Sequence, residues 1–293
     1  MSASPAPRTN APGRPQATVI GSSWRALSRL LPFALLTLAM MPAQALAVAL
    51  RLPLATALPR WYHRLCLRLL GVRLEVHGEC VETRPTLYVA NHSSYFDISI
   101  YGALLPASFI AKAEVARWPF FGWLAKLQRS VFIDRAQRNT RDHLRAIDAR
   151  LKAGDSLILF PEGTSDDGNQ VLPFRSSLLA VAELAVDGKP LTVQPVSLAY
   201  ARLDGIALGR HLRPYFAWYG AMDLAGHLWR LAGLGALTAV VVFHPPVTLA
   251  EFADRKALTR HCQRVVADGL GQALAGRLPR TMRMRRRAHA QPA

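Results

Sequence analysis

Residues 86–97 read TLYVANHSSYFD, a short apolar run followed by a polar turn and the start of a helical pattern. Thr86–Ala90 is typical of a buried strand, and the apolar spacing of Ile98–Leu105 is typical of a helix. The turn between them holds His92 and Asp97. Open α/β sheets place their sites at the carboxyl ends of strands, so we expect both side chains at such an edge.

The spacing of His92 and Asp97 limits how the two side chains can meet. Within one regular helix, five residues leave them about 140° apart, on different faces. They can meet only if His92 lies in the turn before the helix and Asp97 in its first turns, with Ser93 or Ser94 placed to cap the helix. The carboxylate would then fix the imidazole tautomer, and the histidine could take a proton from a hydroxyl. Most isolated pairs of this kind are structural.

From about residue 70, short apolar runs alternate with longer helical stretches. Besides Thr86–Ala90, the predicted strands are Val72–Val76, Ser130–Ile133, Ser156–Phe160, Leu191–Leu198 and Ala236–Phe243. Besides Ile98–Leu105, the predicted helices are Thr140–Lys152, Leu178–Val186 and most of Glu251–Leu274. This alternation predicts an α/β fold with a mainly parallel central sheet flanked by helices.

The N-terminal stretch Leu30–Leu50 contains no charged residue. A helix of this length is about 31 Å long, which matches a bilayer core of about 30 Å. A signal peptide and a soluble core helix are alternatives, but arginines on both sides of the stretch favour a membrane-anchoring helix. Pro32 and Pro42 would kink the helix, so a straight span, a re-entrant segment and a two-helix anchor all stay open.

The chain has 36 Lys and Arg against 19 Asp and Glu, a net charge of +17. This excess calls for an anionic partner, and nucleic acid, a membrane surface and a phosphorylated substrate are the candidates. No nucleic-acid-binding module is recognisable, so we expect anionic membrane lipids rather than nucleic acid. Three scattered cysteines predict neither a disulfide framework nor a zinc site.

Two further segments place polar residues after short strands. In FPEGTS (residues 160–165), Gly163 permits a tight turn, so Glu162 is expected in a loop at the same sheet edge as His92. In VFIDR (residues 131–135), Arg135 could offer a bidentate fork to a phosphate. Taken singly, these features could also be a solvated turn and a surface ion pair between Arg135 and Asp134.

Together, the segments resemble the glycerophospholipid acyltransferase family, typified by 1-acylglycerol-3-phosphate acyltransferases, over about residues 70–250. The matching blocks are His92 and Asp97 with Asn91 before them, FIDR at 132–135, FPEGT at 160–164 and the weaker VQPV at 193–196. Four blocks in the family's order make a chance match improbable. Because both His92 and Asp97 are present, an enzyme is favoured over a scaffold with a degenerate copy of the fold.

The resemblance implies transfer of a fatty acyl chain from acyl-CoA or an acyl carrier protein to the free sn-2 hydroxyl of 1-acylglycerol-3-phosphate, giving phosphatidic acid. His92 would be the general base and Asp97 the residue that orients it. The attack would be direct, with no metal and no cofactor beyond the thioester co-substrate. The residues expected to bind substrate are Arg135, Glu162, Gly163, Thr164, Asn91 and Arg175.

One departure from the family pattern concerns the acceptor. Many members that acylate lysophosphatidic acid have Arg after the Gly-Thr of the third block, whereas this chain has Ser165, followed by Asp166 and Asp167. Losing a cation and gaining two acids weakens the case for a phosphate headgroup, although Arg175 could compensate. Bacterial lyso-ornithine lipid acyltransferases also resemble this sequence, including the serine, and supply the alternative acceptor.

These expectations divide the chain into four regions. They are a disordered leader at residues 1–23, a membrane-anchoring helical segment at 24–69, an acyltransferase domain at 70–275 and a basic tail at 276–293. The catalytic domain is expected on the cytoplasmic side of the inner membrane.

Overall fold

The computed structural model describes residues 21–133 and 140–278, with no side chains described for 140–142. The main strands are β1 Val72–His77, β2 Thr86–Ala90, β3 Ala107–Lys112, β4 Val131–Ile133, β5 Ser156–Leu159, β8 Thr192–Leu203, β9 Ile206–Ala207, β10 Leu237–Phe243 and β11 Val247–Thr248. A small separate sheet pairs β6 Ala185–Val186 with β7 Lys189–Pro190. The α-helices are α1 Ser23–Ala49, α2 Leu54–Leu69, α3 Phe96–Leu104, α4 Phe121–Leu127, α5 Thr140–Lys152, α6 Leu224–Gly233 and α7 Arg255–Leu274. Short 3-10 helices are η1 Ala113–Arg117, η2 Leu178–Glu183, η3 Arg213–Tyr215 and η4 Leu249–Glu251.

The central sheet runs in the order β1-β10-β8-β2-β5-β3-β4. Neighbouring strands along this path are parallel except β8 and β10, while β9 and β11 pair with β8 in the antiparallel sense. The predicted α/β fold with a mainly parallel sheet is therefore confirmed. β2 lies between β5 and β8, so the chemistry-bearing turn that follows β2 emerges from the middle of the sheet.

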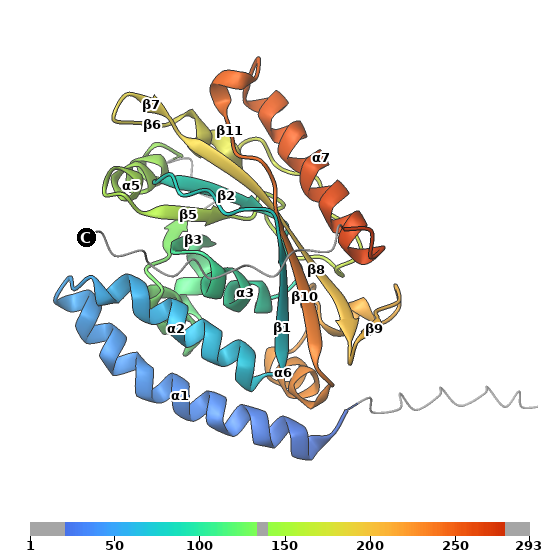
Figure 1. The fold of residues 1–293 in the computed structure, drawn as a ribbon. Coiled ribbons are helices and arrows are strands. Elements are labelled where there is room, and N and C mark those ends of the chain that lie inside the picture. The colour runs from blue at the N-terminus through green and yellow to red at the C-terminus, as the bar shows by residue number, and fades with distance from the viewer. Residues whose placement is uncertain (1–20, 134–139, 279–293) are drawn as a thin grey trace, which may run out of the picture.

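Both faces of the sheet are covered by helices. All five residues of β2 are buried for this reason. Tyr88 and Ala90 belong to the core shared with α2, α3 and α6, whereas Leu87 and Val89 belong to the core shared with α5 and α7. Alternate residues of a strand point to opposite faces, so a strand covered on both sides reads as a continuous apolar run. Figure 1 shows α2 and α3 on one side of the sheet and α7 on the other.

The N-terminal segment forms a pair of helices. α1 continues through Pro32 and Pro42 and is followed by α2 after a four-residue connection, residues 50–53. The sequence left open a straight span, a re-entrant segment and a two-helix anchor, and the structure has two helices joined by a turn (Figure 1). Among the residues that the structure describes, α1 is the one helix that is long and apolar enough to cross a membrane.

The burial and contacts of α1 can be compared with those expected of a soluble core helix, one of the alternatives to a membrane anchor. Only 17% of its most apolar stretch is buried, whereas a soluble core helix would be mostly buried. Its side chains also bond to the folded body: Arg29 donates to the Leu234 carbonyl at 2.8 Å, and the hydroxyls of Thr37 and Tyr62 lie 2.9 Å apart. α1 therefore bonds to the folded body at several points while most of its apolar surface stays exposed.

Some predicted elements differ from the structure. The predicted helix Leu178–Val186 is η2 followed by strand β6, because Asp187 and Gly188 turn the chain back into β7 with positive φ at both positions. The helix expected from Glu251 starts at Arg255, where Asp254 caps it by accepting from the Ala257 N–H. Strand β3 and helices α4 and α6 were not predicted.

Candidate active site

Two of the predicted motifs meet at the carboxyl edge of the sheet. β2 and β5 are parallel neighbours, so the turn after β2 and the loop after β5 emerge side by side. Glu162 of the second loop accepts a hydrogen bond from the His92 backbone N–H at 2.8 Å. The sequence prediction that both motifs share one edge is correct.

His92 and Asp97 have the arrangement that their spacing requires. His92 lies in the turn before α3, Asp97 lies in the first turn of α3, and His92 Nδ1 is 2.9 Å from Asp97 Oδ2. The same Asp97 oxygen accepts from the backbone N–H groups of Ser93 and Ser94, at 2.7 and 3.0 Å. Neither serine caps the helix with its side chain, because Tyr95 is the capping residue.

A tyrosine that sequence reasoning missed supports Asp97 from the neighbouring strand. The hydroxyl of Tyr200, on β8, donates to the second oxygen of Asp97. Burial raises the pKa of Tyr200 well above its ordinary value, so the hydroxyl keeps its proton and acts as a donor. A fully buried carboxylate needs such donors because it has no water to solvate it.

Two contacts fix the imidazole of His92: a hydrogen bond to Asp97 at one ring edge and stacking on Phe160 at one ring face. The contact with Asp97 places the ring proton on Nδ1, which leaves Nε2 as the hydrogen-bond acceptor. The ring stacks on Phe160, with centroids 4.3 Å apart. Asp97 is fully buried, whereas 23% of the His92 side chain is exposed. A base held this way can take a proton from a hydroxyl that approaches from solvent or lipid.

Glu162 fixes the turn that contains His92 through hydrogen bonds to the backbone. Its second oxygen accepts from the Leu172 N–H at 2.9 Å, so both oxygens bond to backbone groups. Burial, with smaller contributions from Asp97 and Asp166, raises the pKa of Glu162 to about 8. This geometry favours a positioning role for Glu162, and its contact with substrate stays a prediction.

The other predicted binding residues divide into buried and exposed groups. The buried amide of Asn91 exchanges two hydrogen bonds with the Leu198 backbone, at 2.9 and 2.8 Å, which ties the turn to β8. Gly163 has a φ of 77°, the left-handed conformation that favours glycine. Thr164 and Arg175 are exposed. Arg135 lies outside the described residues.

The segment after Gly163 places acids near His92. Ser165 Oγ donates to the Trp218 carbonyl at 2.6 Å, and the Asp166 N–H donates to the His92 carbonyl at 3.2 Å. Asp167 accepts two hydrogen bonds from Asn169. Oδ2 of Asp166 is buried and has no hydrogen-bond partner among the described residues, which is uncommon for a buried carboxylate oxygen.

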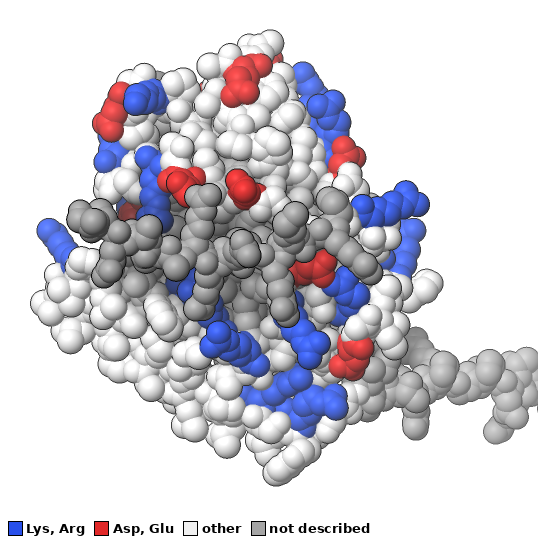
Figure 2. All heavy atoms as spheres, viewed as in Figure 1, with Lys and Arg blue, Asp and Glu red and all other residues white. Residues whose placement is uncertain are grey.

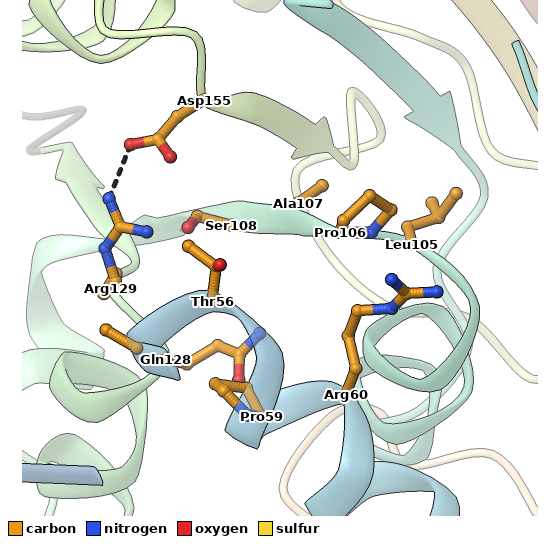
Figure 3. A pocket seen from close by; sticks show the side chains of 11 residues that line it. Thr56, Pro59, Arg60, Leu105, Pro106, Ala107, Ser108, Gln128, Arg129 and Asp155 are labelled. Carbon is orange, nitrogen blue, oxygen red and sulfur yellow. Dashed lines mark hydrogen bonds and ion pairs between the residues drawn. The ribbon is translucent and has the colours of Figure 1, made fainter. Parts of the chain in front are cut away.

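A pocket at the amino edge of the sheet lies away from this chemistry. It is bounded by Arg60 of α2, by Ser108 near the start of β3 and by the ion pair of Arg129 with Asp155, whose atoms are 2.7 Å apart (Figure 3). His92 and Asp97 instead follow the carboxyl end of β2. Among the described residues, no group of three His, Cys, Asp or Glu side chains could hold a metal ion.

Comparison with known proteins agrees with this site. The model of the family described as Acyltransferase matches residues 73–199. The lyso-ornithine lipid O-acyltransferase of Brucella abortus is 42% identical over 83% of this chain and 92% of its own. The 1-acyl-sn-glycerol-3-phosphate acyltransferase of Neisseria gonorrhoeae is 35% identical over 64% and 71%. The crystal structure of the 1-acyl-sn-glycerophosphate acyltransferase PlsC from Thermotoga maritima matches with a TM-score of 0.57, at 25% identity, over 76% of this chain and 81% of that one.

Proposed function

The chain belongs to the acyltransferase family, and on that premise we propose that it transfers a fatty acyl chain from an acyl thioester to the hydroxyl of a lyso-ornithine lipid. Acyl transfer to a lysolipid is common to the relatives named above. The sequence put lysophosphatidic acid first as acceptor. The relative that covers more of both chains at higher identity favours the alternative, lyso-ornithine lipid.

The geometry around His92 supports a direct transfer. Nε2 takes the proton of the acceptor hydroxyl while the hydroxyl oxygen attacks the thioester carbonyl. An ester bond forms, the carbon–sulfur bond breaks, and the proton passes from His92 to the departing sulfur. Asp97 stabilises the imidazolium that exists between these two proton transfers. Both acyl-CoA and an acyl carrier protein can supply the thioester.

The observation that carries the choice of acceptor is the acidic segment beside His92. An ornithine linked to its first acyl chain by one amide bond keeps one ammonium and one carboxylate. The Asp166 carboxylate has a buried oxygen without a partner among the described residues, and the Asp166 backbone bonds to that of His92. It is suited to an ammonium, whereas a phosphate at this position would be repelled. Arg135 is the cation predicted for the carboxylate.

We also propose where the reaction takes place. α1 and α2 attach the protein to the inner membrane, and the catalytic domain lies on the cytoplasmic side, where soluble acyl thioesters are available. Anionic lipids bind the basic tail at residues 276–293.

A competition assay tests the proposed acceptor. The purified full-length protein is given one acyl thioester with equal amounts of lyso-ornithine lipid and lysophosphatidic acid, and both products are quantified. We expect the ornithine lipid product to dominate. Dominant formation of phosphatidic acid would contradict the proposed acceptor and support the one that the sequence put first.

A further inference from the structure

The segment at residues 117–126, RWPFFGWLAK, exposes four large aromatic side chains. It runs from the last residue of η1 through most of α4 and is called the aromatic segment here. The exposed fractions are 39% for Trp118, 37% for both Phe120 and Phe121, and 63% for Trp123. Soluble monomers seldom gather exposed apolar groups of this size in one place unless the surface binds something.

The aromatic segment continues the apolar surface of α1. The buried Gln44 of α1 donates to the carbonyl of Leu127 at 2.8 Å, which docks α4 on this helix. One apolar hollow is shared by the two helices and is lined by Met41, Pro42, Ala45, Trp123, Lys126 and Leu127. Whatever surrounds the outer side of α1 therefore also meets Trp123.

We propose that the aromatic segment is a second membrane contact, in which its aromatic side chains enter the interfacial region of a phospholipid bilayer beside α1. Aromatic side chains favour this region because they combine an apolar ring with polarisable or polar groups. Leucines exposed along α1 supply the adjoining apolar area, and they are Leu27, Leu31, Leu35, Leu38 and Leu46. This inference depends on membrane association and not on the identity of the acceptor.

Charge around the aromatic segment fits an anionic bilayer. Lys112, Arg117 and Lys126 are exposed at or near its ends, against one exposed acid, Glu114. Such cations can bind lipid phosphates while the rings lie below them. In Figure 2, viewed as in Figure 1, the surface in the region of α1 is mostly white and Lys and Arg gather near α2.

The backbone holds the aromatic segment in this shape. Gly122 is buried, and a Cβ at this position would lie only 2.5 Å from the Ala116 carbonyl oxygen. Phe120 has a φ of 61°, which is uncommon for a residue other than glycine. The tight turn therefore fixes the backbone at Phe120, whose ring packs edge to face against that of Phe121, with centroids 5.6 Å apart.

The aromatic segment also connects to the catalytic turn. Trp118 packs edge to face against Trp218, with ring centroids 5.9 Å apart. The backbone N–H of Trp218 donates to the Ser93 carbonyl at 2.9 Å, and the Trp218 carbonyl accepts from Ser165 Oγ. Insertion of the aromatic segment would thus hold the turn that contains His92 close to the membrane surface, where a lysolipid acceptor resides.

Quenching of tryptophan fluorescence tests the inference. The full chain and its Trp123→Phe variant are bound to vesicles of phosphatidylcholine and phosphatidylglycerol, with and without bromine on the acyl chains. The difference between the two proteins gives the emission of Trp123 alone. We expect bromine to quench this emission at least twofold. Emission of Trp123 that is unchanged by brominated lipid would overturn the proposal.

Binding affinity gives a second measurement with a matched control. The double variant Phe121→Ser/Trp123→Ser should bind these vesicles roughly fivefold or more weakly in high salt, because two rings no longer leave water. Ile206→Ser, which removes an exposed apolar side chain from β9, should bind like wild type. Equal losses in the two variants would contradict a localised contact. Acyl transfer to detergent-dispersed acceptor should stay intact, which separates failure here from failure of the proposed function.

Discussion

The carboxyl edge of the sheet and the face formed by α1 and α4 treat their side chains in opposite ways. At the edge, polar groups are buried and bonded to one another: Asp97 accepts from four donors, and Glu162 from two. On the α1 face, large apolar groups such as Leu35 and Trp123 are about 60% exposed and pack on little. The first arrangement suits precise proton transfer, and the second suits a fluid apolar partner.

If the two regions have these separate roles, variants in each region should affect different properties. Changes at the carboxyl edge should alter turnover or acceptor choice and leave vesicle binding intact. Changes on the α1 face should do the reverse when the acceptor is supplied in detergent. The predictions below concern the carboxyl edge and run from the largest expected effect to the smallest.

Replacing the proposed base should have the largest effect. His92→Ala should lower kcat by about 10²–10⁴-fold, the usual contribution of general base catalysis. Asp97→Asn should lose comparably, because a neutral amide cannot stabilise an imidazolium. Turnover is measured on lyso-ornithine lipid, and vesicle binding and the unfolding midpoint serve as controls. A folded His92→Ala protein with near-normal turnover would refute the mechanism.

Removing a group that acts through Asp97 should have an intermediate effect. Tyr200→Phe deletes one donor to a buried carboxylate, and such charge-assisted bonds contribute about 1.5–3 kcal/mol. We expect kcat to fall about tenfold to a hundredfold with KM for the acceptor nearly unchanged. The pH profile of kcat should also shift, since the Asp97 carboxylate loses a hydrogen-bond donor that stabilises it. A loss confined to thermal stability would mean that Tyr200 has no part in positioning.

Asp166→Asn should act on the acceptor rather than on the chemical step. Losing the partner of an ammonium should raise the KM for lyso-ornithine lipid by about one order of magnitude. Asp167→Asn is the matched control, because Asp167 already binds Asn169. Equal effects of the two substitutions would remove the case for a specific contact at Asp166.

The smallest effect concerns the pH dependence of stability. Glu162 has a folded pKa of about 8 against an ordinary value of 4.5, mainly because it is buried. Between these values the folded protein retains a proton that the unfolded chain releases, so the free energy of unfolding falls as the pH rises through this window. Glu162→Gln cannot titrate, and denaturant unfolding should show a flatter dependence. An unchanged slope would contradict the raised pKa.

Local features of the sequence predicted much of this structure. The strand, turn and helix at residues 86–105 and the meeting of His92 with Asp97 depend on neighbours within a few residues, so spacing was enough. Tyr200 was missed because its contact depends on β8 lying next to β2, which no local pattern encodes. The buried pairing of Asn91 with Leu198 was missed for the same reason. The order of the strands in the sheet, which places β8 next to β2, is seen only in the structure.

The errors have physical causes that the sequence did contain. The helix predicted at Leu178–Val186 ignored Asp187-Gly188, a strong hairpin signal. Helix α4 was not predicted, and its place depends on docking against α1, which no local pattern encodes. Arg135, the cation predicted at the end of β4, lies outside the described residues, and its role stays a prediction.

The central claim is direct attack of the acceptor hydroxyl on the thioester with His92 as base. Its most direct test measures the release of thiol and the formation of ester in the same reaction. Wild-type protein in vesicles receives an acyl thioester, first without and then with lyso-ornithine lipid. Direct attack assisted by His92 predicts no burst of free thiol before the acceptor is added, one ester formed per thiol afterwards, and loss of both in His92→Ala. A stoichiometric burst of thiol without acceptor, or undiminished ester formation by His92→Ala, would contradict the account.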